Sequence, residues 1–434
     1  MRVLLVGSGG REHALAMAIA RSPKLTKLYI APGNPGTAHF GKNVNIASDN
    51  IIELVKFAQK NHIDLVVPGP ELPIIEGLTD SCTLAGIACA GPTQKAAQLE
   101  GSKSFTKSIC NAANIPTANW QEFTDVNKAL TYVQKQKFPL VIKADGLAAG
   151  KGVIIAYNIK EAQDALTDMM INNHFGKAGQ KIVVEEFLVG EEVSLFAFCD
   201  GKDAILIGAA QDHKRIGDND TGPNTGGMGA VSPPPFFGKK AQQDALELTI
   251  LPMLKEMNRR GIPFRGVIFA GLMLTQTGVY LIEYNTRFGD PEAEVLLPRL
   301  QSDLLTILYN LSQGKLAKTD IQFSEQIALC VVMAAKNYPG TPITGGVIKH
   351  IDKAENYPNV KIFHAGTALN DKHELYAAGG RVLCVTALHD TLAKAQETAY
   401  LAIKEIDWKD AIWRTDIGKK ALNYINTKTS KTID

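Results

Sequence analysis

The sequence predicts a multidomain protein of α/β and α+β class, in which an N-terminal doubly wound parallel sheet precedes a central region and a C-terminal α+β domain. Its 434 residues exceed what one hydrophobic core usually organises, so two to four domains are expected. Strands and helices alternate over residues 1–100, which is typical of a parallel sheet covered on both faces. From about residue 325 the pattern changes to short strands with many Gly and Pro.

Composition and charge are those of an ordinary soluble protein, with 45% hydrophobic and 21% charged residues. A formal net charge of +2 gives no reason to expect a nucleic-acid partner, which usually requires a concentrated basic face. No apolar run is long enough to span a membrane, and the chain enters a strand at Arg2 without a signal peptide. We therefore expect a cytoplasmic protein that binds neither nucleic acid nor a membrane.

The six cysteines are scattered through apolar segments without a Cys-x-x-Cys pair, and the nine histidines show no metal-binding spacing. Both patterns argue against a zinc site and a disulfide framework. We expect buried, reduced thiols, as in the cytosol.

The first hundred residues contain three strands, each followed by a helix. These elements are expected at Arg2–Val6, Glu12–Arg21, Lys27–Ala31, Asn50–Asn61, Ile63–Pro68 and Pro73–Ala85. Ligands of such sheets bind at the carboxyl edge of the strands. Gly69-Pro-Glu71, after the third strand, lies at that edge.

A glycine-rich segment, Gly7-Ser-Gly-Gly-Arg-Glu-His13, joins the first strand to the first helix. Glycines let the backbone approach an anion, and the helix N-terminus supplies free N–H groups and a positive dipole. Glu12 stands in place of the last glycine of a dinucleotide fingerprint, and no acidic residue ends the second strand, which disfavours a nicotinamide cofactor. Binding of a phosphate or sugar phosphate is favoured, and a turn needed only for packing is the alternative.

A second glycine-rich turn, Asp145-Gly-Leu-Ala-Ala-Gly-Lys-Gly152, joins the expected strands Leu140–Ala144 and Val153–Ala156. Two strands with such a turn form a flap that can close over phosphates, and Lys143 on the first strand supplies a point charge. The spacing does not match a P-loop. An expected helix, Gln94–Ala112, carries Lys103 ahead of the flap. Read alone, the turn also fits a surface hairpin.

Acidic residues end the next strand, in Lys181-Ile-Val-Val-Glu-Glu-Phe-Leu-Val-Gly-Glu-Glu192, which follows an expected helix at Glu161–Asn172. An extended backbone there can hydrogen-bond an adenine edge, and a carboxylate can hold ribose hydroxyls. Exposed acids at the end of an amphipathic strand are the alternative.

A long polar loop, Gln211–Gly229, follows the expected antiparallel strands Val193–Cys199 and Ala204–Ala210. Loops of this length inside a compact domain are usually functional or disordered. Its charged residues that can position a small charged substrate are Asp212, Lys214 and Arg215.

The segment Leu281–Glu294 carries the densest chemistry, after an expected helix at Ala241–Arg260 and a strand at Gly266–Leu274. Glu283 and Asn285, two positions apart on a strand, project from one face. Two oxygen ligands at that spacing suit Mg²⁺, which usually keeps phosphate oxygens in its shell. A solvated strand end followed by a charged turn is the alternative.

The C-terminal pattern indicates a separate α+β domain, preceded by a helix at Pro298–Gln313. Its strands are expected at Gln326–Ala335, Gly346–His350, Val360–His364 and Arg381–Ala387, with a helix at Asp390–Ile406. No charged cluster stands out there, so this domain is expected to contribute little chemistry.

The ordered set of these parts resembles the ATP-grasp superfamily. Within it, four segments resemble the phosphoribosylamine–glycine ligase family: Val6–Ala14, Ala144–Gly152, Gln211–Arg215 and Arg287–Glu294. The resemblance covers essentially the whole chain. It implies an N-terminal pre-ATP-grasp domain over residues 1–102 that binds phosphoribosylamine, a two-subdomain ATP-grasp core over 103–324 with its flap subdomain at about 120–190, and a C-terminal domain over 325–434.

The resemblance also implies a carbon–nitrogen ligase that joins glycine to 5-phosphoribosylamine through a glycyl phosphate, consumes ATP and uses Mg²⁺ or Mn²⁺. A monomer with this single activity is expected, with small-molecule substrates as its partners.

Residues are carried over position by position. The implied ATP-binding residues are Lys103, Lys143, Gly146, Gly150, Lys151, Gly152, Glu185, Glu186, Phe187, Leu188 and Glu192. The implied metal ligands are Glu283 and Asn285 alone, because the preceding strand Phe269–Met273 has no acidic residue. The implied substrate-binding residues are Gly9, Gly10, Arg11, Asp212, Lys214, Arg287 and Asp290, of which Arg287 and Asp212 are expected to be catalytic.

Two alternatives remain open. A carboxylase-type ATP-grasp enzyme acting on another purine intermediate would share the fold and the ATP-binding residues. A regulatory nucleotide-binding module would also share the fold, but the presence of Lys143, Glu283 and Asn285 favours an enzyme.

Overall fold

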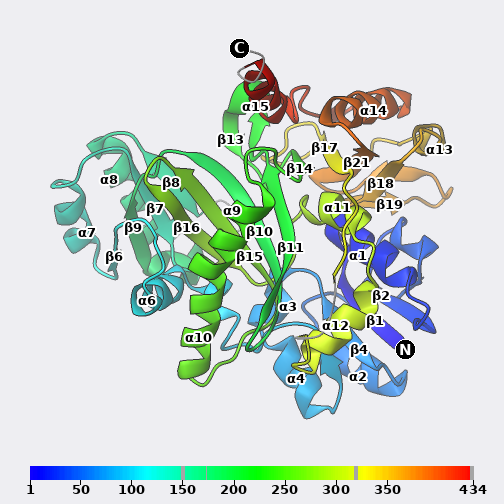
Figure 1. The fold of residues 1–434 in the computed structure, drawn as a ribbon, viewed down its shortest axis with the longest axis horizontal. Coiled ribbons are helices and arrows are strands. Elements are labelled where there is room, and N and C mark those ends of the chain that lie inside the picture. The colour runs from blue at the N-terminus through cyan, green and yellow to red at the C-terminus, as the bar shows by residue number, and fades with distance from the viewer. Residues whose placement is uncertain (148–151, 173, 317–320, 431–434) are drawn as a thin grey trace.

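The computed structural model describes residues 1–147, 152–172, 174–316 and 321–430 (Figure 1). Its N-terminal part is a parallel sheet of five strands in the order β3-β2-β1-β4-β5. The strands are β1 (Arg2–Gly7), β2 (Lys27–Pro32), β3 (Lys42–Asn43), β4 (Leu65–Pro68) and β5 (Ala88–Cys89). The doubly wound parallel sheet expected from the sequence is confirmed.

Alternation along β1 divides the core around this sheet into two faces. Val3 and Leu5 pack with α1 (Gly10–Ala20), whereas Leu4 and Val6 pack with α2 (Ile51–Lys60) and α4 (Leu78–Leu84). The chain moves to opposite sides of β1 to form β2 and β4, so the loops after β1 and β4 flank a crevice at the carboxyl edge. The segments at Gly7 and Gly69 therefore lie side by side.

Two helices expected to be continuous are broken. The segment Pro73–Ala85 forms α3 (Glu71–Ile75) and α4, because Gly77 between them has a left-handed φ of +94°. The segment Gln94–Ala112 forms α5 (Gln98–Gly101) and α6 (Lys103–Ala113). Ser102 caps α6 by accepting a hydrogen bond from the Phe105 N–H at 3.1 Å.

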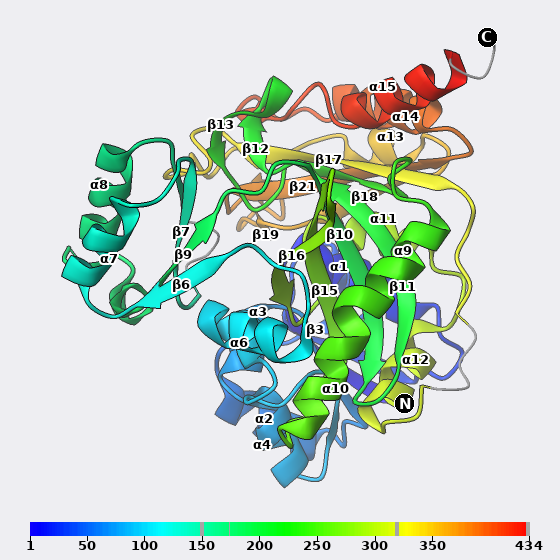
Figure 2. The same ribbon diagram turned by 60° about the vertical axis from the view of Figure 1, so that its left-hand side comes forward.

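The flap subdomain is a four-stranded antiparallel sheet in the order β6-β9-β7-β8, and it projects from the rest of the molecule (Figure 2). Its strands are β6 (Trp120–Phe123), β7 (Leu140–Ala144), β8 (Val153–Ala156) and β9 (Ile182–Glu186). Helices α7 (Val126–Val133) and α8 (Ile159–Met170) share a hydrophobic core with this sheet that is separate from the other cores. The sequence analysis missed β6 and α7.

The largest sheet has nine strands in the order β16-β15-β10-β11-β14-β17-β21-β18, with β22 paired to β17. Its strands are β10 (Glu191–Asp200), β11 (Ala204–Asp212), β14 (Gly229–Ser232), β15 (Arg265–Thr275), β16 (Gly278–Asn285), β17 (Ile327–Ala335), β18 (Val360–His364), β21 (Arg381–His389) and β22 (Ala411–Ile412). Val231 on β14 faces Gln211 on one side and Leu329 on the other. The C-terminal region therefore shares one continuous sheet with the central region and does not form a sheet of its own.

Helices cover both faces of this sheet. On one face, α9 (Lys239–Ala245) and α10 (Leu251–Arg259) run together through a π-helical segment at Leu246–Ile250. On the other face, α11 (Ala293–Leu296) and α12 (Leu304–Ser312) pack with α1 in a core shared with the N-terminal sheet. The remaining helices are α13 (Ile351–Glu355), α14 (Leu392–Glu405) and α15 (Lys419–Ser430).

Two short sheets complete the description. The hairpin of β12 (Arg215–Gly217) and β13 (Thr221–Asn224) lies inside the segment expected to be a long loop. The other pair is β19 (Thr367–Leu369) and β20 (Leu375–Ala377). The prediction of a strand at Gly346–His350 is wrong. Only isolated bridges form there, from Val347 to Tyr376 and from Lys349 to Asp407.

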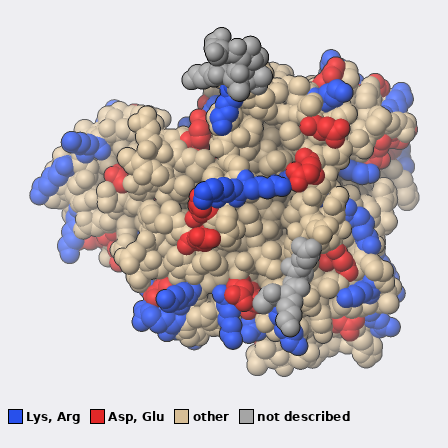
Figure 3. Space-filling view, in the orientation of Figure 1, with Lys and Arg blue, Asp and Glu red and all other residues tan. Residues whose placement is uncertain are grey.

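The cysteines and the surface charges seen in Figure 3 follow the pattern expected from the sequence. All six cysteines are buried and free, as expected. Lys and Arg are interspersed with Asp and Glu on the face shown in Figure 3. Within the described ranges, no helix combines the length and apolar character needed to cross a bilayer.

Candidate active site

The expected metal ligands lie together at the end of β16. A bulge between β15 and β16 places Glu283 opposite Gly271 and Asn285 opposite Phe269. The two side chains interact, and three lysines surround them: although burial would raise the pKa of Glu283, Lys214, Lys143 and Lys103 lower it. Glu283 is therefore ionised at neutral pH, in an environment where carboxylates also pair with the lysines: Glu185 with Lys143 and Glu192 with Lys214.

This oxygen pair fits a divalent cation that takes its other ligands from phosphate. One carboxylate and one amide oxygen are hard ligands of the kind that Mg²⁺ prefers. Among the residues that the structure describes, no group of three or more His, Cys, Asp or Glu side chains could hold a metal.

Two of the nearby lysines are held by one buried carboxylate. Lys143 on β7 and Lys107 on α6 each lie 3.0 Å from Glu185 on β9. Lys107 Nζ also donates to Thr117 Oγ1 at 2.6 Å. The Glu185 side chain therefore fixes the lysines. The sequence analysis did not place Lys107 in the site, although it lies one helical turn after Lys103 and so shares a face with it.

The start of the flap turn is tied to α6. Lys103 Nζ donates to the Gly146 carbonyl at 3.2 Å, and burial lowers the pKa of Lys103. Asp145 accepts hydrogen bonds from the Ser104 N–H at 3.0 Å and from Ser104 Oγ at 2.7 Å. Gly152 is buried at the far end of the turn, where its carbonyl accepts from the Ala144 N–H at 2.8 Å. Gly150 and Lys151 lie outside the described residues.

The acidic strand end links the flap to the large sheet. Glu186 at the end of β9 accepts a hydrogen bond from the Asn119 N–H at 2.9 Å. Phe187 and Leu188 follow, half-buried, between β9 and β10. Glu192 on β10 accepts a hydrogen bond from Lys214 Nζ. This contact brings the expected ribose carboxylate to the lysine pocket.

A group of carboxyl side chains lies beside Lys214. Burial raises the pKa of Asp212, at the end of β11, well above its usual value, and Glu292 raises it further. Burial also raises the pKa of Glu292, whose Oε1 accepts from Ser194 Oγ at 3.1 Å. Lys214 remains charged, because Glu192, Glu283 and Asp212 raise its pKa against the effect of burial. The sequence analysis included Asp212 and missed Glu292.

The first glycine-rich turn meets the charged turn after β16. Arg11 donates through Nε to Glu12 Oε1 at 2.6 Å and through Nη1 to the Phe288 carbonyl at 3.1 Å. Asp290 Oδ2 accepts from the Arg11 N–H at 3.3 Å. Glu12 Oε2 accepts from the Gly9 N–H at 2.6 Å. Glu12 therefore stabilises the conformation of this turn. The sequence analysis gave it no role beyond replacing the last glycine of a dinucleotide fingerprint.

Arg287 connects the metal pair to the N-terminal sheet. Its Nη2 lies 2.9 Å from Glu100 Oε1 and donates to Asn285 Oδ1 at 3.3 Å, and its Nε lies 3.3 Å from Glu71 Oε2. Arg287 thus orients Asn285 from a position at the crevice of the parallel sheet.

Arg381 on β21 also enters the site. Its Nη2 lies 3.1 Å from Asp290 Oδ1, and its Nη1 donates to the carbonyls of Gly226 and Asp290 at 2.6 and 2.7 Å. The expectation that the C-terminal region contributes little chemistry is therefore wrong at this residue. No local pattern marked Arg381, since its side chain bonds to Asp290 and Gly226, more than ninety residues away in sequence.

A buried carboxyl group, Glu294, gives a prediction for stability. Burial, Asp290 and Cys384 raise the pKa of Glu294 well above its usual value, and Arg381 only partly opposes them. The folded state therefore keeps this proton while the unfolded chain loses it, so the contribution is full below the unfolded pKa and is lost as pH rises through the folded pKa. Each unit of upward shift removes about 1.4 kcal/mol once that range is passed.

Glu294→Gln imitates the protonated acid, so the unfolding temperature of this variant should rise relative to that of the wild type as the pH increases above the unfolded pKa of Glu, about 4.5. Thermal unfolding monitored by circular dichroism at several pH values measures this difference. Parallel pH profiles for the two proteins would contradict the shift.

Comparisons with known proteins agree with this geometry. The three domain models of phosphoribosylglycinamide synthetase match the chain: the N domain at residues 1–100, the ATP-grasp (A) domain at 101–293 and the C domain at 328–420. The phosphoribosylamine–glycine ligase of Brucella melitensis is 51% identical over 422 residues, covering 97% of this chain and 98% of that protein. Its counterpart from Escherichia coli is 48% identical, covering 97% and 99%.

Solved structures add a comparison of the fold. The phosphoribosylamine–glycine ligase of Thermotoga maritima superposes with a TM-score of 0.83 at 30% identity, covering 96% of this chain and 100% of that one. The biotin carboxylase domain of the Hydrogenobacter thermophilus 2-oxoglutarate carboxylase superposes with a TM-score of 0.72 at 15% identity, covering 95% and 91%, which shows a common fold alone. The chain therefore belongs to the phosphoribosylglycinamide synthetase family, with that family's N, ATP-grasp and C domains.

Proposed function

We propose that the cleft described above uses ATP to join glycine to 5-phosphoribosylamine, giving N1-(5-phosphoribosyl)glycinamide, ADP and phosphate. This is the ligation of the second step of de novo purine biosynthesis. The observation that carries the proposal is the pair of oxygen ligands, Glu283 and Asn285, two positions apart at the end of β16. The charges of Lys103, Lys143 and Lys214 lower the pKa of this glutamate.

The nucleotide is assigned to the space between the flap and the large sheet. Lys103 and Lys143 neutralise its phosphates, and the turn from Gly146 to Gly152 covers them. The backbone at Phe187 and Leu188 is assigned to hydrogen bonds with the adenine edge. The carboxylate of Glu192 is assigned to hydrogen bonds with the ribose hydroxyls. Mg²⁺ or Mn²⁺, held by Glu283 and Asn285, supplies charge neutralisation at the phosphates.

The reaction proceeds by two displacements. A carboxylate oxygen of glycine attacks the γ-phosphorus and ADP leaves, giving glycyl phosphate. The nitrogen of phosphoribosylamine then attacks the acyl carbon, phosphate leaves with the bridging oxygen, and the nitrogen loses a proton. Such phosphoryl transfer needs positioning and charge neutralisation more than a protein nucleophile.

Glycine and the reacting amine are assigned to the region between Arg287 and Asp212. Arg287 supplies a fixed positive charge for a carboxylate. Burial raises the pKa of Asp212 well above its usual value, which suits a group that takes up and releases a proton. Closure of the flap excludes water, which would otherwise hydrolyse the acyl phosphate.

Phosphoribosylamine is assigned to the crevice of the N-terminal sheet. Gly9, Gly10 and Arg11 at the start of α1 are assigned to the 5-phosphate, which the positive end of the helix and the Arg11 guanidinium would attract. Asp290, fixed by Arg11 and Arg381, faces the same turn and can accept hydrogen bonds from ribose hydroxyls. In this proposal the amine lies toward Arg287.

The domain boundaries remain as predicted from the resemblance, at residues 1–102, 103–324 and 325–434. The monomeric state and the cytoplasmic location also stay predictions.

An assay of ADP release with different acids and amines tests the function. ADP should appear only when glycine and phosphoribosylamine are both present. Bicarbonate or formate in place of glycine should leave the rate at background. ADP release that depends on bicarbonate would instead support the carboxylase-type alternative.

The close approach of Gly69 to Glu12 gives a prediction for phosphoribosylamine binding. A Cβ atom at Gly69 would lie 2.6 Å from Glu12 Cδ, so Gly69→Ala must displace the carboxylate that holds Gly9 and Arg11. We expect the KM for phosphoribosylamine to rise by about tenfold or more, because one charged hydrogen-bonded contact is worth roughly 1.5–3 kcal/mol. Steady-state kinetics at saturating ATP and glycine measure this change.

Gly238→Ala is the matched control, since nothing lies within 4 Å of a Cβ at Gly238. Its KM should equal that of the wild type. Equal KM values for both variants and the wild type would contradict the role given to Glu12.

A further inference from the structure

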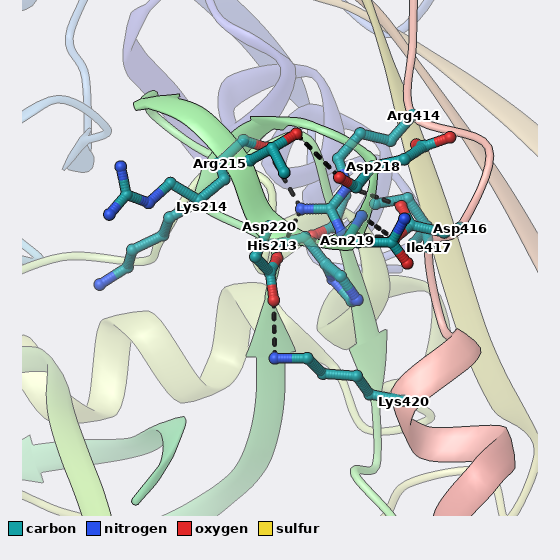
Figure 4. Close-up of polar contacts among 12 residues, drawn as sticks. His213, Lys214, Arg215, Asp218, Asn219, Asp220, Arg414, Asp416, Ile417 and Lys420 are labelled. Atoms are coloured by element: carbon teal, nitrogen blue, oxygen red, sulfur yellow. Dashed lines mark hydrogen bonds and ion pairs between the residues drawn. The ribbon is translucent and has the colours of Figure 1, made fainter. Parts of the chain in front are cut away.

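The C-terminal segment Arg414–Lys420 holds the β12–β13 hairpin through a dense set of polar contacts (Figure 4). Asp218 accepts hydrogen bonds from the N–H and the hydroxyl of Thr415. The Asn219 N–H donates to Asp416 Oδ2 at 2.7 Å. These contacts join segments almost two hundred residues apart in sequence, and the proposed function assigns no role to them.

Arg414 is the centre of this cluster. Its guanidinium is 2% exposed and donates to both oxygens of Asp416, at 2.8 and 2.9 Å. The remaining nitrogen, Nη1, donates to Asp220 Oδ1 at 2.7 Å and to the main-chain carbonyl of Arg215 at 3.2 Å. A planar guanidinium satisfied on three sides is a rigid connector, which an ammonium group cannot reproduce.

His213, between β11 and β12, makes a second contact with the segment Arg414–Lys420. Its Nε2 accepts a hydrogen bond from the Gly418 N–H at 3.3 Å, and its Nδ1 contacts the Gly229 carbonyl at 3.2 Å. Burial, together with the nearby charge of Arg414, lowers the pKa of His213 to about 4, so the ring is neutral and can accept this bond.

The residue between these two anchored positions is Lys214. Its main-chain carbonyl accepts from the Thr225 N–H at 2.7 Å and from Thr225 Oγ1 at 2.8 Å, so its backbone is fixed on both sides. Its side chain leaves the cluster, as Figure 4 shows, and reaches Glu192. Lys214 is also the first of the cations that act on Glu283.

We propose that Arg414 is a positioning residue for the ligation: by fixing the carbonyl of Arg215, it holds the Lys214 ammonium group between Glu192 and Glu283. The inference rests on the function proposed above for Lys214 as a substrate-binding residue. Arg414 touches no substrate, and its effect on the reaction passes through Lys214.

The neighbouring Lys420 provides a control within the same cluster. Its Nζ lies 2.6 Å from Asp220 Oδ2, but its side chain is 58% exposed. Within the part of the chain that the structure describes, it bonds to neither Arg215 nor Lys214. Exposed ion pairs of this kind contribute little. Lys420→Met should therefore change kcat/KM for ATP by less than about twofold.

A double-mutant cycle tests the proposal. Lys214→Met should lower kcat/KM for ATP by about 10²-fold, since it removes the charge that pairs with Glu192 and acts on Glu283. Arg414→Lys should lower it by up to about 10²-fold, because small misplacements of such groups are costly. In the Arg414→Lys background, adding Lys214→Met should cost less than about threefold more, since both changes disable one group.

Circular dichroism and assays well below the unfolding midpoint separate this effect from a loss of fold. If Arg414→Lys does not fold, Asp416→Asn loosens the same guanidinium and takes its place in the cycle. Losses that multiply in the double mutant would overturn the positioning role while leaving the proposed function intact. A Lys214→Met protein with wild-type kinetics would overturn the role of Lys214 itself and, with it, this inference.

Discussion

Glu283→Gln is expected to lower kcat/KM for ATP by about 10³-fold, the largest effect on activity of any single change considered. A divalent cation stabilises developing phosphoryl charge by several kcal/mol, and each 1.36 kcal/mol corresponds to a factor of ten. The substitution keeps the shape of the side chain but removes the charge that faces Lys214, Lys143 and Lys103. The three ammonium groups would then lose the nearby charge of Glu283. The divalent metal ion would lose its only charged protein ligand.

Steady-state ADP release over a range of Mg²⁺ concentrations measures this effect. Raising Mg²⁺ should recover part of the loss, because the weakened site still contains Asn285. Glu397→Gln on the exposed face of α14 is the matched control and should behave as the wild type. Full activity in Glu283→Gln at low Mg²⁺ would rule out Glu283 as a metal ligand.

Glu185→Gln is expected to cause the largest loss of stability, about 3–5 kcal/mol, because it leaves two buried ammonium groups without their carboxylate. Lys107 and Lys143 each lie 3.0 Å from Glu185, and all three side chains are at most 5% exposed. An amide can accept one hydrogen bond but cannot neutralise either charge. The flap sheet, to which β7 and β9 contribute Lys143 and Glu185, should therefore loosen first.

Urea unfolding, followed by the fluorescence of Trp120 on β6, reports on this sheet. Glu122→Gln is the matched control, since Glu122 on the same strand is 51% exposed and lies 3.9 Å from Lys181. It should change the free energy of unfolding by less than about 1 kcal/mol. A loss in Glu185→Gln no larger than that of the control would show that the buried triad does not stabilise the flap.

The parts of the fold that were predictable are those whose residues pack against sequence neighbours. The continuous apolar run of β1, Val3–Val6, marks it as a strand buried on both faces, and the glycines after it mark the turn at the ligand edge. By contrast, β6 has mostly exposed side chains and becomes a strand only by pairing with β9, about sixty residues later. The β12–β13 hairpin has no apolar pattern at all and is held by Arg414 and Asp416.

The candidate site divides in the same way. Glu283 and Asn285 could be paired from the sequence because strand geometry alone puts them on one face. Glu292 and Arg381 could not, since each acts on a partner that only the folded chain brings near. The role of the Glu185 side chain was also hidden, because its two lysines come from different elements.

Isotope transfer from glycine to phosphate tests the central claim most directly. Glycine labelled with ¹⁸O in its carboxylate is supplied with ATP and phosphoribosylamine, and the released phosphate is analysed by mass spectrometry. If the cleft activates glycine as an acyl phosphate, each phosphate carries one ¹⁸O atom from glycine. Unlabelled phosphate formed in step with the glycinamide product would contradict activation of glycine by phosphoryl transfer in this cleft.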